Sequence, residues 1–406
     1  MSASENFPLA SITTWSSGGT PNRSNPAYWN GAIPWISAAT LKGSRIVGSD
    51  QYLTEAGLRA GSKLAPVGAT LVLVRGMALH RETRIGLAQR RVSFNQDVKA
   101  LVPKSGVLPE FLLFALQARS AEIRNLVSSA GSGTGVLNTQ LLQRLPVWVP
   151  DEGTQRAVIQ AMSNADDLIA TLERLIAKKQ AIKQGMMQQL LTGRTRLPGC
   201  TRRWRTATVG QVASVKTGPF GSSLHERDYV AHGTPIITVE HLGSRDIQGR
   251  GAPMVSDSDR NRLKAYALAE GDIVFSRVGS IDRNALVSSN EVGWLFSGRL
   301  LRVRFDRTIA DPVFMSAQFH SNRFIRAVKT VAVGQTMPSL NTAILKGIQV
   351  SLPPIEEQRR IGKAYSDLDA ELGSLESRLQ KARAIKTGMM QQLLTGRTRL
   401  PVEATS

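Results

Sequence analysis

Two long stretches of the chain carry apolar residues at alternating intervals of four and three positions, which is the pattern of a coiled-coil seam. Prolines stand just before both stretches, at Pro150 and at Pro353-Pro354, and Gly193 and Gly396 follow them. Because such residues mark helix ends, the sequence predicts two helices of about 37 residues each. The predicted seam consists of Val158, Met162, Ile169, Leu172 and Ile176 in the first helix and Ile361, Tyr365, Leu368, Leu372, Leu375 and Leu379 in the second.

A helix of this length, about 55 Å, is too long for one globular domain to bury along its whole length. We therefore expect the two seams to pack on each other. Outside the helices, short β-rich runs alternate with Gly, Pro and Asn, which predicts a mixed α/β fold. The predicted strands include Ile33–Ile36, Thr70–Val74, Val98–Val102, Pro235–Val239, Ile273–Phe275 and Leu300–Phe305, and the predicted shorter helices are Pro109–Asn125 and Asp311–Lys329.

The chain contains an internal repeat with an offset of 203 residues. The fourteen residues GMMQQLLTGRTRLP occur at 185–198 and again at 388–401. The same offset aligns Gln155 with Gln358, and residues 137–139 with residues 340–342. Upstream of these positions the two copies have diverged. The repeat predicts two domains with a pseudo-two-fold relation, at 1–150 and 201–352, each followed by a constant helical region, at 151–200 and 353–406.

The charge of the chain favours a polyanionic partner. The 406 residues carry 51 Lys and Arg against 31 Asp and Glu, a net charge of +20 with a pI near 10.7. Residues 1–150 and 201–350 carry most of this excess. The mean hydropathy is −0.13, no apolar run approaches the ~20 residues that span a bilayer, and no signal-peptide pattern begins the chain. We expect a cytoplasmic protein without disulfides, since Cys200 is the one cysteine.

The motifs of the common DNA-modifying enzymes are absent from the sequence. There is no G-x-x-x-x-G-K-[ST] phosphate loop, no Glu-x-Lys of a metal-dependent nuclease, and no metal-ligand spacing among the five histidines. The glycine-rich stretch 131–135 follows no strand-then-helix pattern, and the residues NPAY at 25–28 lack the second proline of an amino-methyltransferase motif. The sequence therefore predicts a DNA-binding protein without catalytic residues, metal or cofactor.

Candidate DNA contacts lie in polar loops of the two basic domains, because Arg, Asn and Gln are the side chains that most often recognise bases. A cation-rich run follows the predicted strand of residues 70–74, and we expect its counterpart to begin at Arg277. Further candidates lie in the loops before the two LNT sequences. The candidates are Arg75, His80, Arg81, Arg84, Thr134 and Asn138 in the first domain and Arg277, Arg283, Asn284, Gln335, Thr336 and Asn341 in the second.

The constant segment GMMQQLL presents a second apolar surface, which spans too wide an arc for one partner helix. Two interpretations stay open: the segment packs on the neighbouring domain, or it docks a separate protein, the same one in both copies. We favour docking because the segment is identical inside an otherwise diverged repeat. The predicted docking residues are Met186, Met187, Leu190, Leu191, Met389, Met390, Leu393 and Leu394.

Several motifs in order resemble the DNA specificity subunits, of the HsdS type, of type I restriction–modification systems. They are the opening GGTPNRSNPAYWNGAIPWIS at 18–37, GDIVFSRVG at 271–279, the join from residues 340–342 through SLPPIEEQRRI, and the closing LLTGR runs. The resemblance covers nearly the whole chain. The start of the first helix, PDEGT at 150–154, is less typical of the family than PIEEQ at 354–358, so we expect that helix to begin slightly later than its counterpart.

The resemblance implies two target-recognition domains that bind the halves of an asymmetric DNA site, separated by two helices in an antiparallel coiled coil. It also implies two methylation subunits as partners, which supply S-adenosylmethionine and adenine chemistry, and restriction subunits that use ATP and Mg. Alternatives are a targeting subunit for a fused nuclease–methyltransferase, a self-contained DNA-modifying enzyme, and an interaction scaffold whose charge serves solubility alone. Target bases and spacer length do not follow from the sequence.

Overall fold

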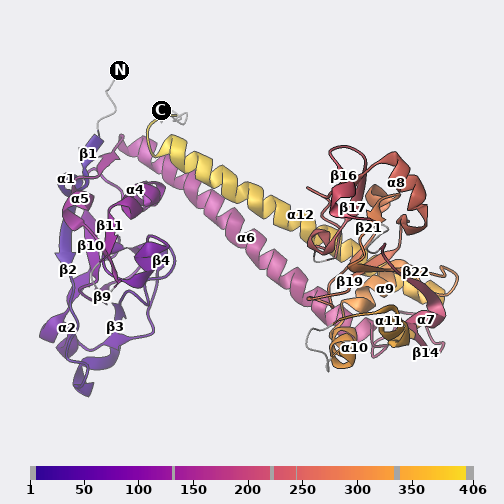
Figure 1. Ribbon diagram of the computed structural model, residues 1–406. Coiled ribbons are helices and arrows are strands. Elements are labelled where there is room, and N and C mark those ends of the chain that lie inside the picture. The colour runs from indigo at the N-terminus through magenta and orange to yellow at the C-terminus, as the bar shows by residue number, and fades with distance from the viewer. Residues whose placement is uncertain (1–5, 130–132, 220–223, 244, 333–338, 399–406) are drawn as a thin grey trace, which may run out of the picture. The chain divides into compact units, whose positions relative to one another are not determined.

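The structure is a computed structural model that describes residues 6–129, 133–219, 224–243, 245–332 and 339–398 (Figure 1). The chain divides into two compact units. Unit 1 comprises residues 1–173 and 377–406, and unit 2 comprises residues 174–376. Each unit therefore contains one predicted domain, the first part of the long helix that follows it, and the last part of the other long helix. No helix in the described ranges is long and apolar enough to cross a membrane.

The domain of unit 1 is built on two sheets, with strand orders β2-β10-β7-β8-β4 and β5-β3-β9-β6. The strands are β1 Asn6–Pro8, β2 Thr13–Ser17, β3 Trp29–Ile36, β4 Arg45–Ile46, β5 Tyr52–Leu53, β6 Lys63–Ala65, β7 Thr70–Leu73, β8 Ile85–Ala88, β9 Val92–Phe94, β10 Val98–Pro103, β11 Val127–Ser129, β12 Gly135–Leu137 and β13 Pro146–Trp148. The helices are α1 Leu9–Ile12, α2 Glu55–Gly61, α3 Pro109–Ala118, α4 Ser120–Asn125 and α5 Thr139–Gln143. Residues 111–116 of α3 are all buried in the main core, together with β7 and β10.

The domain of unit 2 repeats this plan with the sheet β15-β22-β19-β20 and a second sheet β16-β18-β17-β21. Its strands are β14 Arg205–Thr208, β15 Ala213–Thr217, β16 Tyr229–Val230, β17 Thr234–Ile237, β18 Met254–Val255, β19 Ile273–Ser276, β20 Asn284–Leu286, β21 Leu295–Phe296, β22 Leu300–Phe305 and β23 Gln349–Leu352. Its helices are α7 Val209–Val212, α8 Asp257–Arg262, α9 Pro312–Phe319, α10 Asn322–Ala332 and α11 Thr342–Gly347. The prediction of a mixed α/β fold with a repeated domain is confirmed.

The two shorter helices predicted from sequence are each divided in the structure. The stretch 109–125 forms α3 and α4, and the stretch 311–329 forms α9 and α10. In unit 2 the break follows from local hydrogen bonding, because the Ser321 hydroxyl accepts a bond from the Phe324 N–H at 3.3 Å and caps the start of α10. The prediction of continuous helices is therefore wrong.

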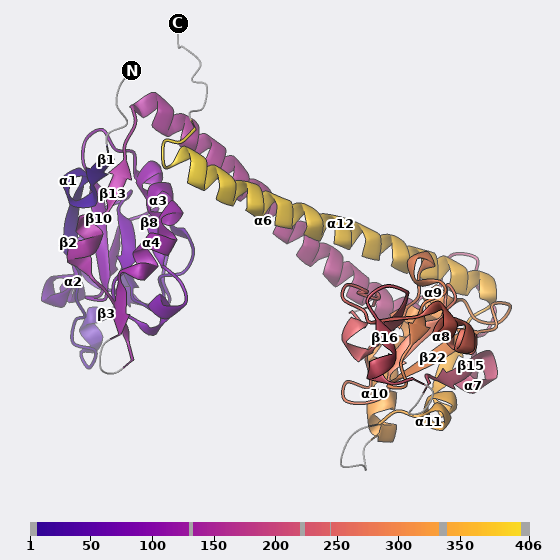
Figure 2. The same cartoon turned by 45° about the horizontal axis from the view of Figure 1, so that its top comes forward.

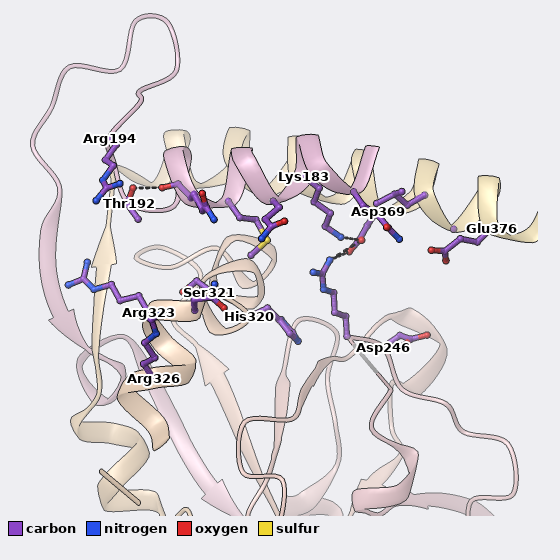
Figure 3. Close-up of a pocket in the computed structure, with 18 residues that line it drawn as sticks. Lys183, Thr192, Arg194, Asp246, His320, Ser321, Arg323, Arg326, Asp369 and Glu376 are labelled. Atoms are coloured by element: carbon purple, nitrogen blue, oxygen red, sulfur yellow. Dashed lines mark hydrogen bonds and ion pairs between the residues drawn. The ribbon is translucent and has the colours of Figure 1, made fainter. Parts of the chain in front are cut away.

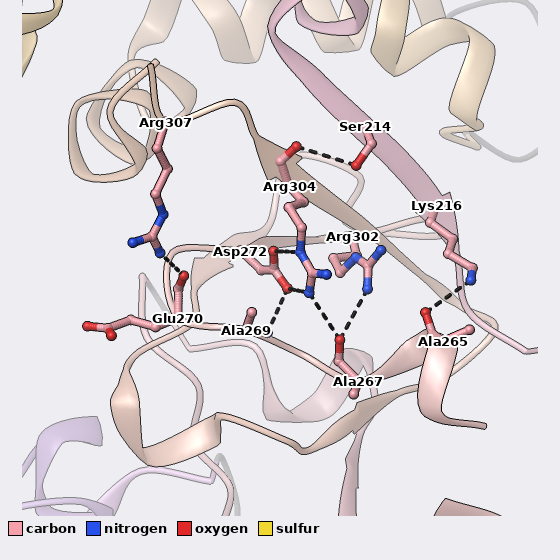
Figure 4. Close-up of polar contacts among 10 residues, drawn as sticks. All are labelled: Ser214, Lys216, Ala265, Ala267, Ala269, Glu270, Asp272, Arg302, Arg304 and Arg307. Carbon is pink, nitrogen blue, oxygen red and sulfur yellow. Dashed lines mark hydrogen bonds and ion pairs between the residues drawn. The ribbon is translucent and has the colours of Figure 1, made fainter. Parts of the chain in front are cut away.

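A buried carboxylate ties β22 to the loop that precedes β19 in unit 2 (Figure 4). The Arg304 guanidinium donates to both carboxylate oxygens of Asp272, at 2.7 and 2.6 Å, and Asp272 is 1% exposed. This hydrogen bonding raises the pKa of Arg304, whereas burial lowers the pKa of the neighbouring Arg302. Arg302 and Arg304 both donate to the Ala267 carbonyl at 3.1 Å. These two cations are thus held by contacts within the fold.

The long helices are α6, Glu152–Leu190, and α12, Ile355–Leu393, with 39 residues each (Figure 2). Their first residues are equivalent in the repeat, so the expectation that the first helix begins later is wrong. Asp151 explains why α6 begins as early as its counterpart. Its carboxylate accepts hydrogen bonds from the Thr154 N–H at 2.9 Å and the Thr154 hydroxyl at 2.7 Å, and so caps the start of the helix. The same bonds, the backbone one first, lower the pKa of Asp151.

Each long helix is joined to its own domain by a buried glutamine. The Gln155 side chain accepts a bond from the Leu108 N–H at 2.8 Å and donates to the carbonyls of Gly106 and Pro150, both at 2.8 Å. Gln358 makes the equivalent contacts in unit 2, to the Asp311 N–H at 2.9 Å and to the carbonyls of Ile309 and Pro353 at 2.9 and 2.8 Å. All partners are related by the repeat offset of 203. The alignment of the two glutamines was visible in the sequence, but their shared role was not.

Candidate nucleic-acid interface

In unit 1 the fold brings together the two loop regions that the sequence singled out for DNA binding. The segment after β7 lies against β12, where Arg75 forms a β-bridge with Val136 and the Leu137 N–H donates to the Val74 carbonyl at 2.8 Å. Gly76 has a φ of 152° and its N–H donates to the Gly135 carbonyl at 2.9 Å. Because a φ in this range favours glycine, Gly76 is the residue that permits this turn.

Unit 2 has the same pair of backbone contacts, a β-bridge and an N–H to carbonyl bond, which together we call the loop frame. Val278 forms a β-bridge with Ser339, and the Leu340 N–H donates to the Arg277 carbonyl at 2.8 Å. These contacts are related to those of unit 1 by the offset of 203. The structural counterpart of Arg75 is therefore Val278, not Arg277 as expected from sequence. The error of one position arose because both domains place an arginine close to the end of the equivalent strand.

The candidates of unit 1 fall into exposed residues and residues that brace the loop. Arg75 and Arg81 are exposed, and no ion pair to them occurs among the described residues. His80 is exposed, with Nε2 at 2.9 Å from the Gly133 carbonyl oxygen. Arg84 pairs with Glu82 at 2.7 Å and donates to the Ala38 carbonyl at 2.7 Å. Arg84 therefore holds the loop in place.

Two further candidates of unit 1 lie beside α5. The Asn138 side chain caps α5 by accepting bonds from the N–H groups of Gln140 and Leu141, both at 3.1 Å. Its oxygen is thus used by the fold, although the side chain remains exposed. Thr134 is half-buried in the segment that faces His80. A DNA contact by either residue stays a prediction.

In unit 2 the structure excludes or reassigns more of the predicted DNA-contact residues. Asn284 is 1% exposed within β20, so its side chain cannot reach DNA in this structure, and the prediction is corrected on that ground. The Arg283 guanidinium donates to the Leu242 carbonyl, and Asn341 caps α11 by accepting a bond from the Ile344 N–H at 2.8 Å. Arg277 is half-buried at the edge of the loop. Gln335 and Thr336 lie outside the described residues.

The predicted seam residues are buried or half-buried, but they do not all face the other helix. Val158 and Met162 belong to the core of the unit 1 domain, and Ile361 and Tyr365 belong to the core of the unit 2 domain. The first two seam positions of each helix therefore pack on the domain that precedes it. Of the remaining positions, Leu172, Ile176, Leu372 and Leu375 are buried, and Ile169, Leu368 and Leu379 are half-buried.

Ion pairs join the two helices within each unit, where the helix segments lie side by side (Figures 1 and 2). In unit 1 Lys386 pairs with Asp166 at 2.5 Å and Arg383 with Glu173 at 2.6 Å. The residue numbers of the pairs rise along α6 while they fall along α12, so the two segments run antiparallel.

In unit 2 Lys179 pairs with Glu371 at 2.8 Å, and Lys183 pairs with Asp369. The order is again antiparallel. The pairs Lys183–Asp369 and Lys386–Asp166 are equivalent in the repeat, and Lys183 is only 7% exposed. A buried lysine, Lys183, and a half-buried one, Lys386, thus occupy positions where an apolar residue would be expected. A coiled coil along the whole length of the helices stays a prediction.

The leucines of the constant GMMQQLL segment lie in domain cores. Leu190 and Leu191 are 8% and 5% exposed and belong to the core of unit 2, and Leu393 and Leu394 are 4% and 1% exposed and belong to the core of unit 1. The methionines Met186, Met187, Met389 and Met390 are half-buried against the same cores. The position of the leucines thus agrees with the first interpretation, in which the segment packs on a domain. Docking of a partner by the segment stays a prediction, and the exposed side chains of the segment would have to make that contact.

A comparison with protein-family models identifies the class of protein. A family model described as the type I restriction modification DNA specificity domain matches residues 1–184 and again residues 201–382. The protein is therefore of the class that gives a type I restriction–modification system its DNA sequence specificity. The chain belongs to this specificity-subunit family, and the resemblance drawn from sequence is confirmed.

Individual relatives agree with this membership. The chain is 20% identical to the MjaIX specificity subunit of Methanocaldococcus jannaschii, over 94% of this chain and 90% of that protein. It is 23% identical to the EcoKI specificity subunit of Escherichia coli K12, over 95% and 86% of the two chains. The match to the EcoR124I/EcoR124II specificity subunit of Escherichia coli is 25% identical and covers 43% of this chain and 44% of that one.

A solved structure shows the same fold. The crystal structure of the type I S subunit from M. genitalium matches with a TM-score of 0.64, covering 96% of this chain and 95% of that one at 14% identity. In the described part of the chain no group of three or more His, Cys, Asp or Glu residues could hold a metal ion.

Proposed function

We propose that the chain recognises an asymmetric DNA site in two parts, one part with each unit, and contributes no catalytic residue itself. The observation that carries the proposal is the duplicated loop frame. The same two backbone contacts hold the loops in both units, whereas the side chains on them differ, as Arg75 and its counterpart Val278 illustrate. A shared backbone frame that carries two different sets of side chains is suited to recognising two different short DNA sequences, because side chains distinguish the base edges.

The partners in this proposal are methylation subunits, two per chain, and restriction subunits in the complete complex. S-adenosylmethionine, ATP and Mg would be bound by those subunits. The two long helices would form an antiparallel coiled coil that sets the unspecified spacer between the half-sites. The repeated ion pairs Lys183–Asp369 and Lys386–Asp166 support an arrangement in which both partners meet equivalent helical surfaces.

Replacing Arg75 and Arg81 together with glutamine tests the loop of unit 1. A bidentate arginine–guanine contact contributes about 1–3 kcal/mol of discrimination, so the ratio of affinities for target and scrambled duplexes should fall at least about tenfold. The measurement is equilibrium binding of both duplexes to the chain assembled with its methylation subunits.

The matched control replaces Arg90 and Arg91, which are exposed in the same unit, and removes the same charge. The control substitutions should weaken binding of both duplexes about equally and leave the ratio of the two affinities unchanged. An unchanged ratio for the Arg75/Arg81 variant would remove this loop from the recognition surface.

A further inference from the structure

Unit 2 contains a cleft of about 1190 Å³ between the helical segments and the start of α10 (Figure 3). Its walls come from the end of α6 and the residues just after it, from α12, from the loop at residues 245–246, and from the turn between α9 and α10 with the start of α10. Five cations line it, namely Lys183, Arg194, Arg245, Arg323 and Arg326. The carboxylates in the lining are those of Asp246, Asp369 and Glu376. The cleft therefore carries an excess of positive charge.

At one end of the cleft two cations share one carboxylate within the protein. Arg245 donates to both carboxylate oxygens of Asp369 at 2.9 Å, and Lys183 pairs with the same carboxylate. Both cations also lie over the ring of Tyr365, at 5.0 and 4.6 Å from its centroid. Burial raises the pKa of Tyr365 to about 12, so its hydroxyl stays protonated. This end of the cleft is a structural ion-pair cluster.

At the other end three arginines are not neutralised. Arg194, Arg323 and Arg326 are exposed, and none forms an ion pair with a described residue. Arg323 donates to the Ser351 hydroxyl at 3.3 Å. Figure 3 shows these three arginines along one side of the cleft, and Asp369 and Glu376 on the other. They form the arginine cluster of the cleft.

Helix α10 connects the arginine cluster to the candidate recognition loop. Arg323, Arg326 and Lys329 follow one another at intervals of three on its exposed side, while Phe324 and Val328 are buried on the other side. Lys329 pairs with Asp282 at 2.9 Å, in the loop that follows Arg277. From Arg323 to Lys329 the helix rises about 9 Å, which corresponds to between two and three base steps of a DNA strand.

We propose that Arg194, Arg323 and Arg326 bind phosphate groups of the DNA backbone that flanks the half-site recognised by unit 2. The inference rests on the proposed function and adds a contact surface to it. DNA fits better than an acidic protein because α10, which carries Arg323 and Arg326, is joined to the recognition loop by the Lys329–Asp282 ion pair. The positions 203 residues before Arg323 and Arg326 are Ser120 and Ile123, whereas the counterpart of Arg194 is Arg397. Two of the three cluster arginines are therefore specific to unit 2.

The test replaces Arg194, Arg323 and Arg326 with glutamine in the full chain assembled with its methylation subunits. Each phosphate contact contributes about 0.9 to the slope of log K against log salt, so the slope should fall by about 2 to 3. The affinity for target DNA should fall, whereas the ratio of target to scrambled duplex should not change, since backbone contacts are independent of sequence. All three side chains are exposed, and the urea midpoint checks that folding is preserved.

The control variant carries Arg250→Gln, Arg260→Gln and Lys264→Gln, which removes three exposed charges elsewhere in unit 2. A slope that falls no further in the cluster variant than in this control would overturn the proposal. An unchanged slope with weakened subunit assembly would also overturn it and assign the cleft to an acidic protein surface. Failure of the wild-type complex to discriminate target from scrambled DNA would instead contradict the proposed function itself.

Discussion

Replacing Gln155 with methionine should lower the free energy of unfolding of unit 1 by about 3 kcal/mol or more, because one N–H and two carbonyls lose their partners in a buried site and each such loss costs about 1–3 kcal/mol. The side chain is 0% exposed, so water does not replace the lost bonds without opening the core. Methionine is close to glutamine in size, which separates the hydrogen bonds from packing.

Gln358→Met should have the same effect on unit 2. Hydrogen-exchange protection measured peptide by peptide distinguishes the units, since a chain of two units need not unfold in one step. Gln155→Met should lower protection in unit 1 alone, and Gln358→Met in unit 2 alone. The control is Gln160→Met, at an exposed position five residues further along α6. Losses below about 0.5 kcal/mol, the usual range for surface substitutions, would show that the buried glutamines do not hold the joints.

Leu394→Ala should destabilise unit 1 by about 2–5 kcal/mol, the usual cost of removing a buried leucine side chain. Leu394 is 1% exposed and lies in the core formed by the N-terminal domain, although almost the whole chain separates the two in sequence. Leu191→Ala should act in the same way on unit 2. Exchange protection in the β7 and β10 peptides of unit 1 reports the first effect.

Ile385→Ala provides the control for Leu394→Ala, because Ile385 lies on α12, the helix that directly precedes Leu394, and is 61% exposed. It should change stability by less than about 0.5 kcal/mol. If Leu394→Ala left unit 1 unchanged but released a methylation subunit from the complex, the leucine would serve docking rather than the core, and our placement would be contradicted.

The long helices could be predicted closely because their pattern is strongly periodic and bounded by proline. What the pattern could not specify was the surface that each apolar residue meets. Met162 and Leu172 share one heptad phase, yet Met162 packs on a domain core. A period of 3.6 identifies a buried face without identifying the partner that buries it. For the same reason the sequence left open whether Leu190 and Leu394 pack in a domain core or dock another protein, and docking, which we favoured, is not what buries these leucines in the structure.

The candidate DNA contacts were predicted less well. Asn138 and Asn341 precede short helices, and an asparagine there caps a helix as readily as it recognises adenine. Asn284 appeared to lie in a loop because the strand β20 is only three residues long. The arginines of α10 were missed, because residue type alone does not separate a phosphate contact from a solvated charge. Only their position between the cleft and the loop sets them apart.

Mapping of methylated adenines in host DNA, with this chain and its methylation subunit present and with this chain removed, tests the central claim most directly. The account predicts a split, asymmetric motif that appears only when both proteins are present. Replacing residues 1–150 with the domain of another family member should change one half of the motif and preserve the other. A continuous palindromic motif, or methylation that persists without this chain, would contradict recognition by two different units.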